Sequence, residues 1–201
     1  AAAQQVLRLT RQDFGPEAPD VIDPLLALAD AQWRDGQTKP AEQNLLAGIA
    51  LIRRHAGPLS ADLIEPLTIL GRLHLQTGRY DEAAETFDRA LRLNHVNLGF
   101  TNSDQLPIMD GLTESYVSLD NIEEATFFQT AQLEIQQRRL GIDNPETAPA
   151  YHKLARWYRR VMMYEDSVLM YQRADRLMRE TLGDASPARI DGLKGLALVY
   201  E

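Results

Sequence analysis

Hydrophobic residues recur along the chain at the spacing of amphipathic α-helices. In the segment that follows Leu63, the side chains of Leu67, Leu70 and His74 keep the i, i+3, i+7 spacing that places them on one helix face. A turn interrupts this stripe, and a second stripe begins near Asp81. The first stripe recurs in four other segments, at Leu25, Leu28, Ala29 and Gln32, at Met109, Leu112, Thr113 and Tyr116, at Tyr151, Leu154, Ala155 and Tyr158, and at Leu193, Leu196, Ala197 and Tyr200. No segment alternates in the manner of a strand, so the pattern predicts an all-α chain of antiparallel helix pairs.

The helix pairs repeat with a period of 42 residues. Glycines occur at this interval along the whole chain, at Gly15, Gly57, Gly99, Gly141 and Gly183. A fixed period of this length is the signature of a repeat architecture, in which each unit buries its apolar face against its neighbours. The period divides the chain into one tandem array: the second helix and loop of a preceding repeat at 1–20, repeats at 21–62, 63–104, 105–146 and 147–188, and the first helix of a following repeat at 189–201. Because the array begins and ends inside repeats, we expect a fragment of a longer one, with bare terminal faces that favour end-to-end stacking.

Small residues and glycines have positional roles within each repeat. Gly71 on the first helix and Ala83 on the second are expected to let the two helices approach closely. The glycine ladder fits the left-handed position just past a helix end, where a Cβ atom would clash. Prolines follow four residues later at Pro19, Pro145 and Pro187, where they are expected to begin the next helix.

The second repeat carries a family signature. The run 70–83, followed by Phe87 and Ala90, resembles the tetratricopeptide consensus closely. The segment 140–148 resembles the loop between kinesin-light-chain-type tetratricopeptide repeats, which share the longer period. The resemblance implies an α-solenoid, a right-handed superhelix of antiparallel helix pairs. It also implies that the first helix of each repeat lines a concave groove that holds a protein or peptide.

The third repeat departs from this consensus. Gln129 and Gln132 replace the Phe and the Ala of its second helix, which indicates that the helix rotates locally or exposes a polar face. HEAT and armadillo repeats have a compatible period and remain the alternative fold. The Gly-Arg-Tyr turn at 78–80, with the alanine that follows it, disfavours that alternative.

The charge balance narrows the classes of ligand. The net charge of −8 argues against nucleic acid, because its binders need a basic surface to displace counterions. No stretch approaches the ~20 apolar residues of a membrane-spanning helix, so we expect no membrane insertion. The chain contains eighteen arginines and three lysines, which hints at a GC-rich bacterial source. The absence of cysteine fits a cytoplasmic or a periplasmic location equally well.

The resemblance places candidate groove residues on the first helices, beside the core stripe at positions i, i+4 and i+7. The row is mixed in character, whereas the core stripe is almost wholly apolar. Its arginines could grip carboxylates of a partner, and Arg does so bidentately. An equally open interpretation is that these are solvated positions paired between neighbouring repeats. The candidates are Asp30, Trp33, Arg72, Asp110, Glu114, His152, Arg156, Arg159 and Lys194.

The sequence offers little for catalysis or for a cofactor. The four histidines are scattered and show no ligand spacing, so we expect no metal site. Phosphate-cradling and nucleophile motifs are absent, and no cofactor is expected. The predicted function is a non-enzymatic scaffold that binds a protein or peptide segment in the groove. The alternatives are a regulatory or substrate-docking arm of a larger enzyme or signalling protein, and a self-associating structural module that forms a homo-oligomer.

Overall fold

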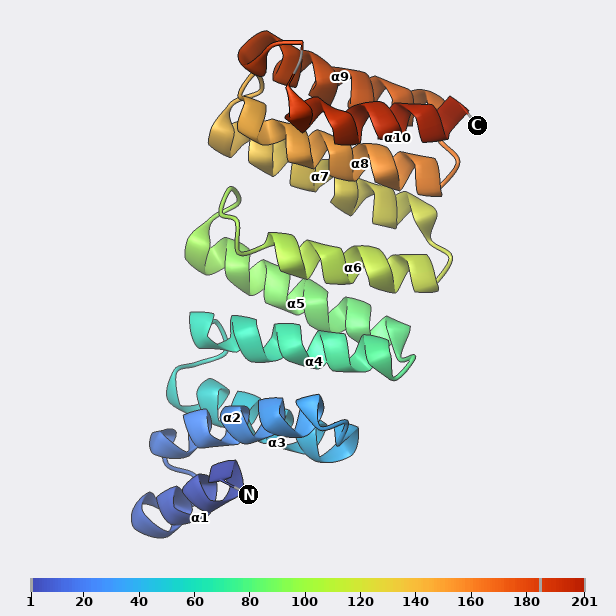
Figure 1. Cartoon of the computed structure of the whole chain (residues 1–201). Helices are drawn as coiled ribbons and strands as arrows, with labels where there is room; N and C mark the ends of the chain where they lie inside the picture. The colour runs from blue at the N-terminus through green and yellow to red at the C-terminus, as the bar shows by residue number, and fades with distance from the viewer. Residues whose placement is uncertain (1, 185, 201) are drawn as a thin grey trace. The chain divides into compact units, whose positions relative to one another are not determined.

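The computed structural model describes residues 2–184 and 186–200, and within them all regular structure is helical. Figure 1 shows the α-helices following one another along the chain. Their bounds are α1 (Ala2–Phe14), α2 (Ile22–Arg34), α3 (Thr38–His55), α4 (Ile64–Gln76), α5 (Tyr80–Leu98), α6 (Leu106–Ser118), α7 (Ile122–Leu140), α8 (Ala148–Arg160), α9 (Tyr164–Leu182) and α10 (Ile190–Tyr200). Short 3₁₀ turns precede four of them, at η1 (Pro19–Val21), η2 (Ala61–Leu63), η3 (Pro145–Thr147) and η4 (Pro187–Arg189). The all-α expectation is confirmed.

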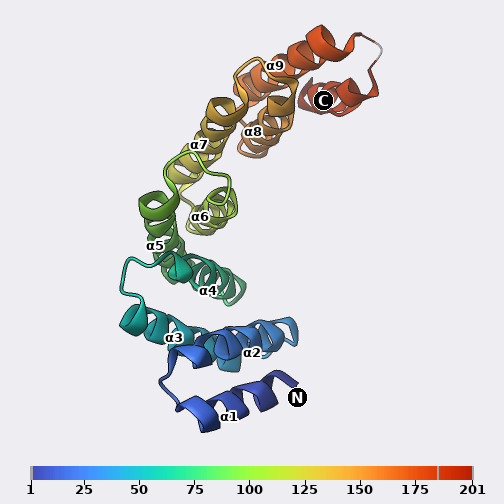
Figure 2. The same cartoon turned by 90° about the vertical axis from the view of Figure 1, so that its left-hand side faces the viewer.

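The helices form two compact units, Ala1–Gly99 with α1 to α5 and Phe100–Glu201 with α6 to α10. Within the units, α2 pairs with α3, α4 with α5, α6 with α7 and α8 with α9, and the helices of each pair run antiparallel (Figure 1). The first helices of these pairs begin at residues 22, 64, 106 and 148, and α10 begins at 190, so each start is 42 residues after the last. The 90° view of Figure 2 shows the same succession of packed pairs inside each unit. We call the first helix of a pair the A helix and the second the B helix.

Small residues hold the helices of a pair together, as expected. On the B helices, Ala41, Ala83, Ala125 and Ser167 are all fully buried. The facing position on an A helix is most restricted at Gly71, where an added Cβ would lie 2.9 Å from the ring of Phe87. A glycine is therefore required opposite that phenylalanine.

The third pair keeps the helical phase of the others, which corrects the expectation of a rotated or exposed B helix. Ala125 of α7 is buried like its equivalents, and Gln129 and Gln132 are only 7% and 4% exposed. Both amides are hydrogen-bonded: Gln129 Nε2 donates to Thr113 Oγ1 (3.1 Å) and Gln132 Nε2 donates to Asp110 Oδ1 (2.9 Å). Because their polar atoms have partners, the two side chains stay inside without any rotation of the helix.

The glycine ladder has positive φ throughout, but its conformation differs from the one expected. Gly99, which follows α5, has φ 79° and ψ 175°, and Gly183, which follows α9, has φ 82° and ψ 168°. This region lies outside the left-handed helical well and is essentially restricted to glycine. The three prolines expected to begin helices each open a 3₁₀ turn that leads directly into an A helix.

The turn between the A and B helices contains a second ladder of positive φ. Gly36 and Gly78 occupy it in the first unit, with φ of 74° and 73°. Asp120 and Met162 occupy it in the second unit, with φ of 58° and 63°. Asp tolerates this conformation, whereas a long unbranched side chain such as that of methionine is strained by it.

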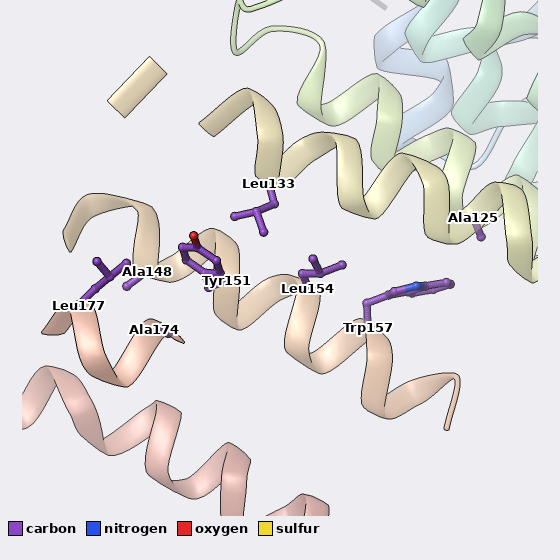
Figure 3. Packing of buried hydrophobic residues seen from close by; sticks show 8 residues of the cluster. All are labelled: Ala125, Leu133, Ala148, Tyr151, Leu154, Trp157, Ala174 and Leu177. Carbon is purple, nitrogen blue, oxygen red and sulfur yellow. The ribbon is translucent and has the colours of Figure 1, made fainter. Parts of the chain in front are cut away.

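The core of the second unit centres on α8. Figure 3 shows Tyr151, Leu154 and Trp157 of this helix between α7, which contributes Leu133 and Ala125, and α9. Ala174 and Leu177 close the cluster from the α9 side. Complete burial of one large apolar side chain contributes roughly 1.5–3 kcal/mol, so this cluster fixes the position of α8.

Helix α10 differs from the apolar stripe expected for it. Leu193 and Tyr200 are 47% and 73% exposed, and the buried positions are Gly192 and Gly195 instead. An added Cβ at Gly195 would lie 2.3 Å from the Tyr171 ring of α9, so the two glycines let α10 approach closely. Among the described residues no B helix follows α10, and the face that such a helix would cover is exposed.

Candidate partner-binding cleft

The A helices of the first unit present two charged candidates beside a bridged pair. Trp33 Nε1 of α2 donates a 2.6 Å hydrogen bond to Gln76 Oε1 of α4, which joins neighbouring repeats. Asp30 accepts an ion pair from Arg34 of its own helix at 2.8 Å. Arg72 of α4 is exposed and takes part in no ion pair within the described chain.

In the second unit a cleft runs between the A helices α6 and α8, and α7 forms its floor. It consists of two adjoining hollows that share Gln129 and Lys153. The smaller, about 250 Å³, lies towards the start of both A helices and is lined by the apolar residues Leu106, Leu133, Leu140, Pro149 and Ala150 together with Gln129, Gln132, Gln136, Glu146 and Lys153. The larger, about 460 Å³, lies towards their ends and is lined by Asp110, Thr113, Glu114, Val117, Gln129, Lys153, Arg156, Trp157 and Arg160. The cleft therefore has an apolar end and a charged end.

A polar bridge crosses the cleft where the two hollows meet. Lys153 Nζ of α8 lies 2.5 Å from Asp110 Oδ1 of α6 and donates to Gln132 Oε1 of α7 at 2.7 Å. Gln132 in turn donates to the same carboxylate. This three-helix bridge depends on Gln132, one of the two glutamines that depart from the consensus. An exposed ion pair of this kind contributes up to about 1 kcal/mol.

One helical turn beyond the bridge, the charges on the two walls are not paired. Glu114 of α6 and Arg156 of α8 are exposed, line the same hollow and form no ion pair among the described residues. Arg160 lies over the Trp157 ring, with its guanidinium carbon 6.0 Å from the ring centroid. The Trp157 indole is fixed in place because its Nε1 donates to Thr126 Oγ1 at 3.0 Å. This end of the cleft thus has an acidic wall on α6 and a basic wall on α8. The charged groups of both walls can form hydrogen bonds with a ligand.

Two of the candidate groove residues on α8, His152 and Arg159, do not line the cleft. His152 is 8% exposed, and its buried Nε2 has no hydrogen-bond partner among the described residues. An added Cβ at Gly192 of α10 would lie 2.8 Å from that nitrogen, so α10 covers the ring. Burial lowers the pKa of His152, and Arg156 lowers it further, whereas Asp191 and Asp175 act in the opposite direction. Arg159 is half-buried, and its Nε likewise has no hydrogen-bond partner in the described part of the chain.

The remaining candidates are distributed as follows. Asp110, Glu114 and Arg156 line the cleft together. Lys194 is exposed on α10 and is not among the residues that line either hollow. Asp30 and Trp33 lie on α2 and Arg72 lies on α4, all in the first unit.

Most cleft residues were missing from the sequence-based candidates, among them the polar residues Gln129, Gln132, Lys153 and Arg160. The glutamines were visible in the sequence as departures from the consensus. Lys153 and Arg160 lie one position beyond His152 and Arg159 in the predicted row. Of the predicted row on α8, His152 is covered by the next A helix α10, whereas Arg156 lines the cleft with Lys153 and Arg160 and faces the preceding A helix α6.

Two classes of site receive no support from the described residues. No group of three or more His, Asp or Glu side chains is placed to hold a metal ion. No helix in this part of the chain combines the length and the apolar character needed to cross a lipid bilayer.

Comparisons with known proteins agree with this geometry. Residues 64–95, which form α4 and most of α5, match the sequence model of the tetratricopeptide repeat. No curated protein sequence gives a significant match to the chain.

Solved structures resemble the whole chain. BtubC (BKLC) from P. vanneervenii superposes with a TM-score of 0.69 at 22% identity, over 98% of this chain and 78% of that one. The repeats of a putative kinesin light chain from Podosopora anserina give a TM-score of 0.72 at 20% identity, over 91% and 87% of the two chains. MamA gives 0.60 at 18% identity, over 91% and 88%. At these identities the likeness concerns the fold, which is that of an α-solenoid. Residues 64–95 therefore form a tetratricopeptide repeat, and the chain as a whole has the α-solenoid fold seen in the repeats of that putative kinesin light chain.

Proposed function

We propose that the chain is a non-enzymatic interaction module that holds a segment of a partner protein in the cleft between α6 and α8. Tetratricopeptide repeats generally mediate protein–protein interactions. The observation that carries the proposal is the row of charged side chains that line one cleft without pairing, Glu114, Arg156 and Arg160. Side chains of opposite charge on neighbouring helices usually pair when they can reach each other, as Asp110 and Lys153 do.

The shape of the cleft supports a segment of chain as the ligand. The apolar hollow of about 250 Å³ adjoins the charged hollow of about 460 Å³, so one extended segment can place apolar and polar side chains at once. Fixed groups such as the Trp157 indole and the hydrogen-bonded Gln129 reduce the entropy lost on binding.

The experiment is affinity capture from a lysate of the source cells with three immobilised proteins. Arg156→Glu reverses a charge inside the cleft. Arg176→Glu, on an exposed arginine of α9 that does not line the cleft, is the matched control. We expect the same partners with the wild type and the control, and their loss with Arg156→Glu. Partners that survive Arg156→Glu unchanged would place binding elsewhere on the chain.

Self-association is a second candidate, favoured by apolar side chains exposed on two helices. Val6, Leu9 and Phe14 of α1 are 52%, 43% and 60% exposed, and Leu193 and Leu198 of α10 are 47% and 50% exposed. An α1 helix from a second copy could cover α10 as a B helix covers an A helix. Light scattering over a wide concentration range should show an increase in mass. A constant monomer mass would exclude this candidate.

A further inference from the structure

The charged end of the cleft repeats an arrangement found in the first unit. Asp30 on α2 and Arg72 on α4 are 42 residues apart, as are Glu114 on α6 and Arg156 on α8. In each unit one A helix thus presents a carboxylate and the next A helix an arginine at the same level. Neither carboxylate pairs with the arginine opposite: Asp30 pairs with Arg34, and no ion pair of Glu114, Arg72 or Arg156 occurs in the described chain.

The two units differ in where the neighbouring A helices are bridged. In the first unit the bridge is Trp33–Gln76, one turn beyond Asp30. The equivalent positions in the second unit are Val117 and Arg160, which are not bridged to each other and line the larger hollow. The second unit is bridged two turns earlier, by Asp110 and Lys153, one turn before Glu114. Among the residues that the structure describes, only those of the second unit therefore form an acidic wall and a basic wall that are open to a ligand beyond the bridge.

We propose that the α6–α8 cleft recognises a partner segment that carries both charges, with a basic side chain against Glu114 and an acidic side chain against Arg156 and Arg160. This inference rests on the proposed function and specifies the chemistry of the partner. A uniformly acidic segment would place a carboxylate beside Glu114, and a uniformly basic one would place a cation beside both arginines. Like charges at such distances disfavour binding, so the two walls select for mixed charge.

The partner segment is expected to be extended, because α6 and α8 are joined directly by side chains at the bridge. At the bridge, one aspartate and one lysine side chain are enough to span from α6 to α8. In an extended chain, successive side chains point to opposite sides. A segment that runs along the cleft therefore directs neighbouring residues to α6 and α8 in turn, and the basic and acidic residues are expected an odd number of positions apart.

The test is selection from a random-peptide display library on the full chain, with neutral variants of similar size. Wild-type protein should enrich peptides that carry a basic and an acidic residue at odd spacing. Glu114→Gln should lose the enrichment of the basic residue and keep that of the acidic one. Arg156→Gln should do the reverse, and Arg176→Gln on α9 should behave as wild type.

A quantitative arm uses one selected peptide and isothermal titration. Each neutral variant is expected to bind it about tenfold more weakly, since each removes one charge-assisted contact. The double variant Glu114→Arg/Arg156→Glu exchanges the charges of the two walls. It should bind a peptide whose two charges have also been exchanged in preference to the original peptide.

The outcomes separate this inference from the proposed function. Peptides of one charge sign only, or mixed peptides that bind Glu114→Gln as tightly as wild type, would overturn the mixed-charge inference and leave the cleft as a binding site. Failure to enrich any peptide with folded wild-type protein would overturn both. Circular dichroism of each variant confirms that the helices are retained.

Discussion

The second and third helix pairs share one backbone pattern and place their polar residues in different layers. In the second pair, the middle layer is Gly71 against Phe87, and the layer near the turn is polar, with His74 Nδ1 3.3 Å from Thr86 Oγ1. In the third pair the middle layer is polar, Thr113 with Gln129, and the layer near the turn is aromatic. There Tyr116 stacks on Phe128 with ring centroids 5.9 Å apart.

This exchange shows what a repeat requires. The helices need one small residue at the closest approach and a partner for each buried polar atom, and the position of the polar layer is free. Its position has a functional consequence, because the glutamines of the third pair face the A-helix side and form the floor of a cleft. The second pair has a phenylalanine and an alanine there instead.

The largest expected effect is on the apolar middle layer. Phe87→Ala should lower the free energy of unfolding of the first unit by about 3–5 kcal/mol, because it leaves a cavity beneath Gly71. Gln129→Ala at the equivalent place should cost the second unit only about 1–2 kcal/mol, since it removes one hydrogen bond from a layer that is already polar.

Urea unfolding measures both effects separately, because Trp33 lies in the first unit and Trp157 in the second. Trp157→Phe and Trp33→Phe backgrounds give one fluorescent reporter for each unit. Equal losses for the two substitutions would contradict the distinction between the layers.

The next effect comes from imposing the second pattern on the third pair. Gln129→Phe alone should destabilise the second unit by about 1–3 kcal/mol, since the ring would meet the Cβ of Thr113. Adding Thr113→Gly recreates the close approach seen at Gly71, where a Cβ would lie 2.9 Å from the ring. The double variant should recover most of the loss in the same urea assay. If the changes in the free energy of unfolding caused by Gln129→Phe and Thr113→Gly simply add, the two layers cannot be exchanged.

A smaller effect is expected at the turn between A and B helices. Met162→Gly should stabilise the second unit by roughly 0.5–1 kcal/mol. The substitution removes the strain of a positive φ, and this gain is larger than the loss caused by the greater freedom of glycine in the unfolded chain. Asp120→Gly should change stability less, because aspartate already tolerates this conformation. Thermal melting of both variants tests the ranking, and a lower melting temperature for Met162→Gly would contradict it.

The smallest effect is a pH dependence of the stability of the second unit. Burial lowers the pKa of His152, so the folded state favours the neutral ring. The stability that this provides is present above the ordinary histidine pKa of about 6.5 and is lost as the pH falls through the lower folded value. His152→Gln should flatten this part of the profile when urea midpoints are followed by Trp157 fluorescence. Arg156 lowers the pKa of His152, whereas Asp191 and Asp175 raise it. A neutral residue in place of Arg156 should therefore make the urea midpoint fall less as the pH drops. A neutral residue in place of either aspartate should make the urea midpoint fall more.

Much of the fold could be read from the sequence because the period is carried by backbone requirements. Some positions need a glycine for positive φ, and others need a small residue where two helices approach most closely. Replacement at these positions lowers the stability of the fold, so their regular spacing can be seen in the sequence. The unusual glutamines at 129 and 132 could also be recognised in the sequence, but whether they are buried or exposed could not. A consensus states which residues are usual at a position and does not state which hydrogen-bond partners a buried amide has. Asp110 and Thr113 supplied those partners.

The candidate site was harder to predict because it depends on the contacts of individual helices. His152 was assigned to the groove by its position in the row, and α10 covers it because Gly192 permits a close approach. Lys153 was missed because no sequence pattern distinguishes the residues of an A helix that face the preceding A helix. The strained turn at Met162 was also hidden, since methionine gives no hint of positive φ.

Because the helices repeat at a constant interval, the residues that form the cleft can be moved to another repeat of the chain. Each A helix starts 42 residues after the previous one, so residues 106–147 could replace residues 64–105 without lengthening or shortening any connection. Such a graft would carry the glutamine floor and the acidic wall of α6 to a new place in the chain. A matching graft of α8 would supply the basic wall. The number of clefts would then be set by copy number, and one partner carrying several recognition segments could be held by avidity.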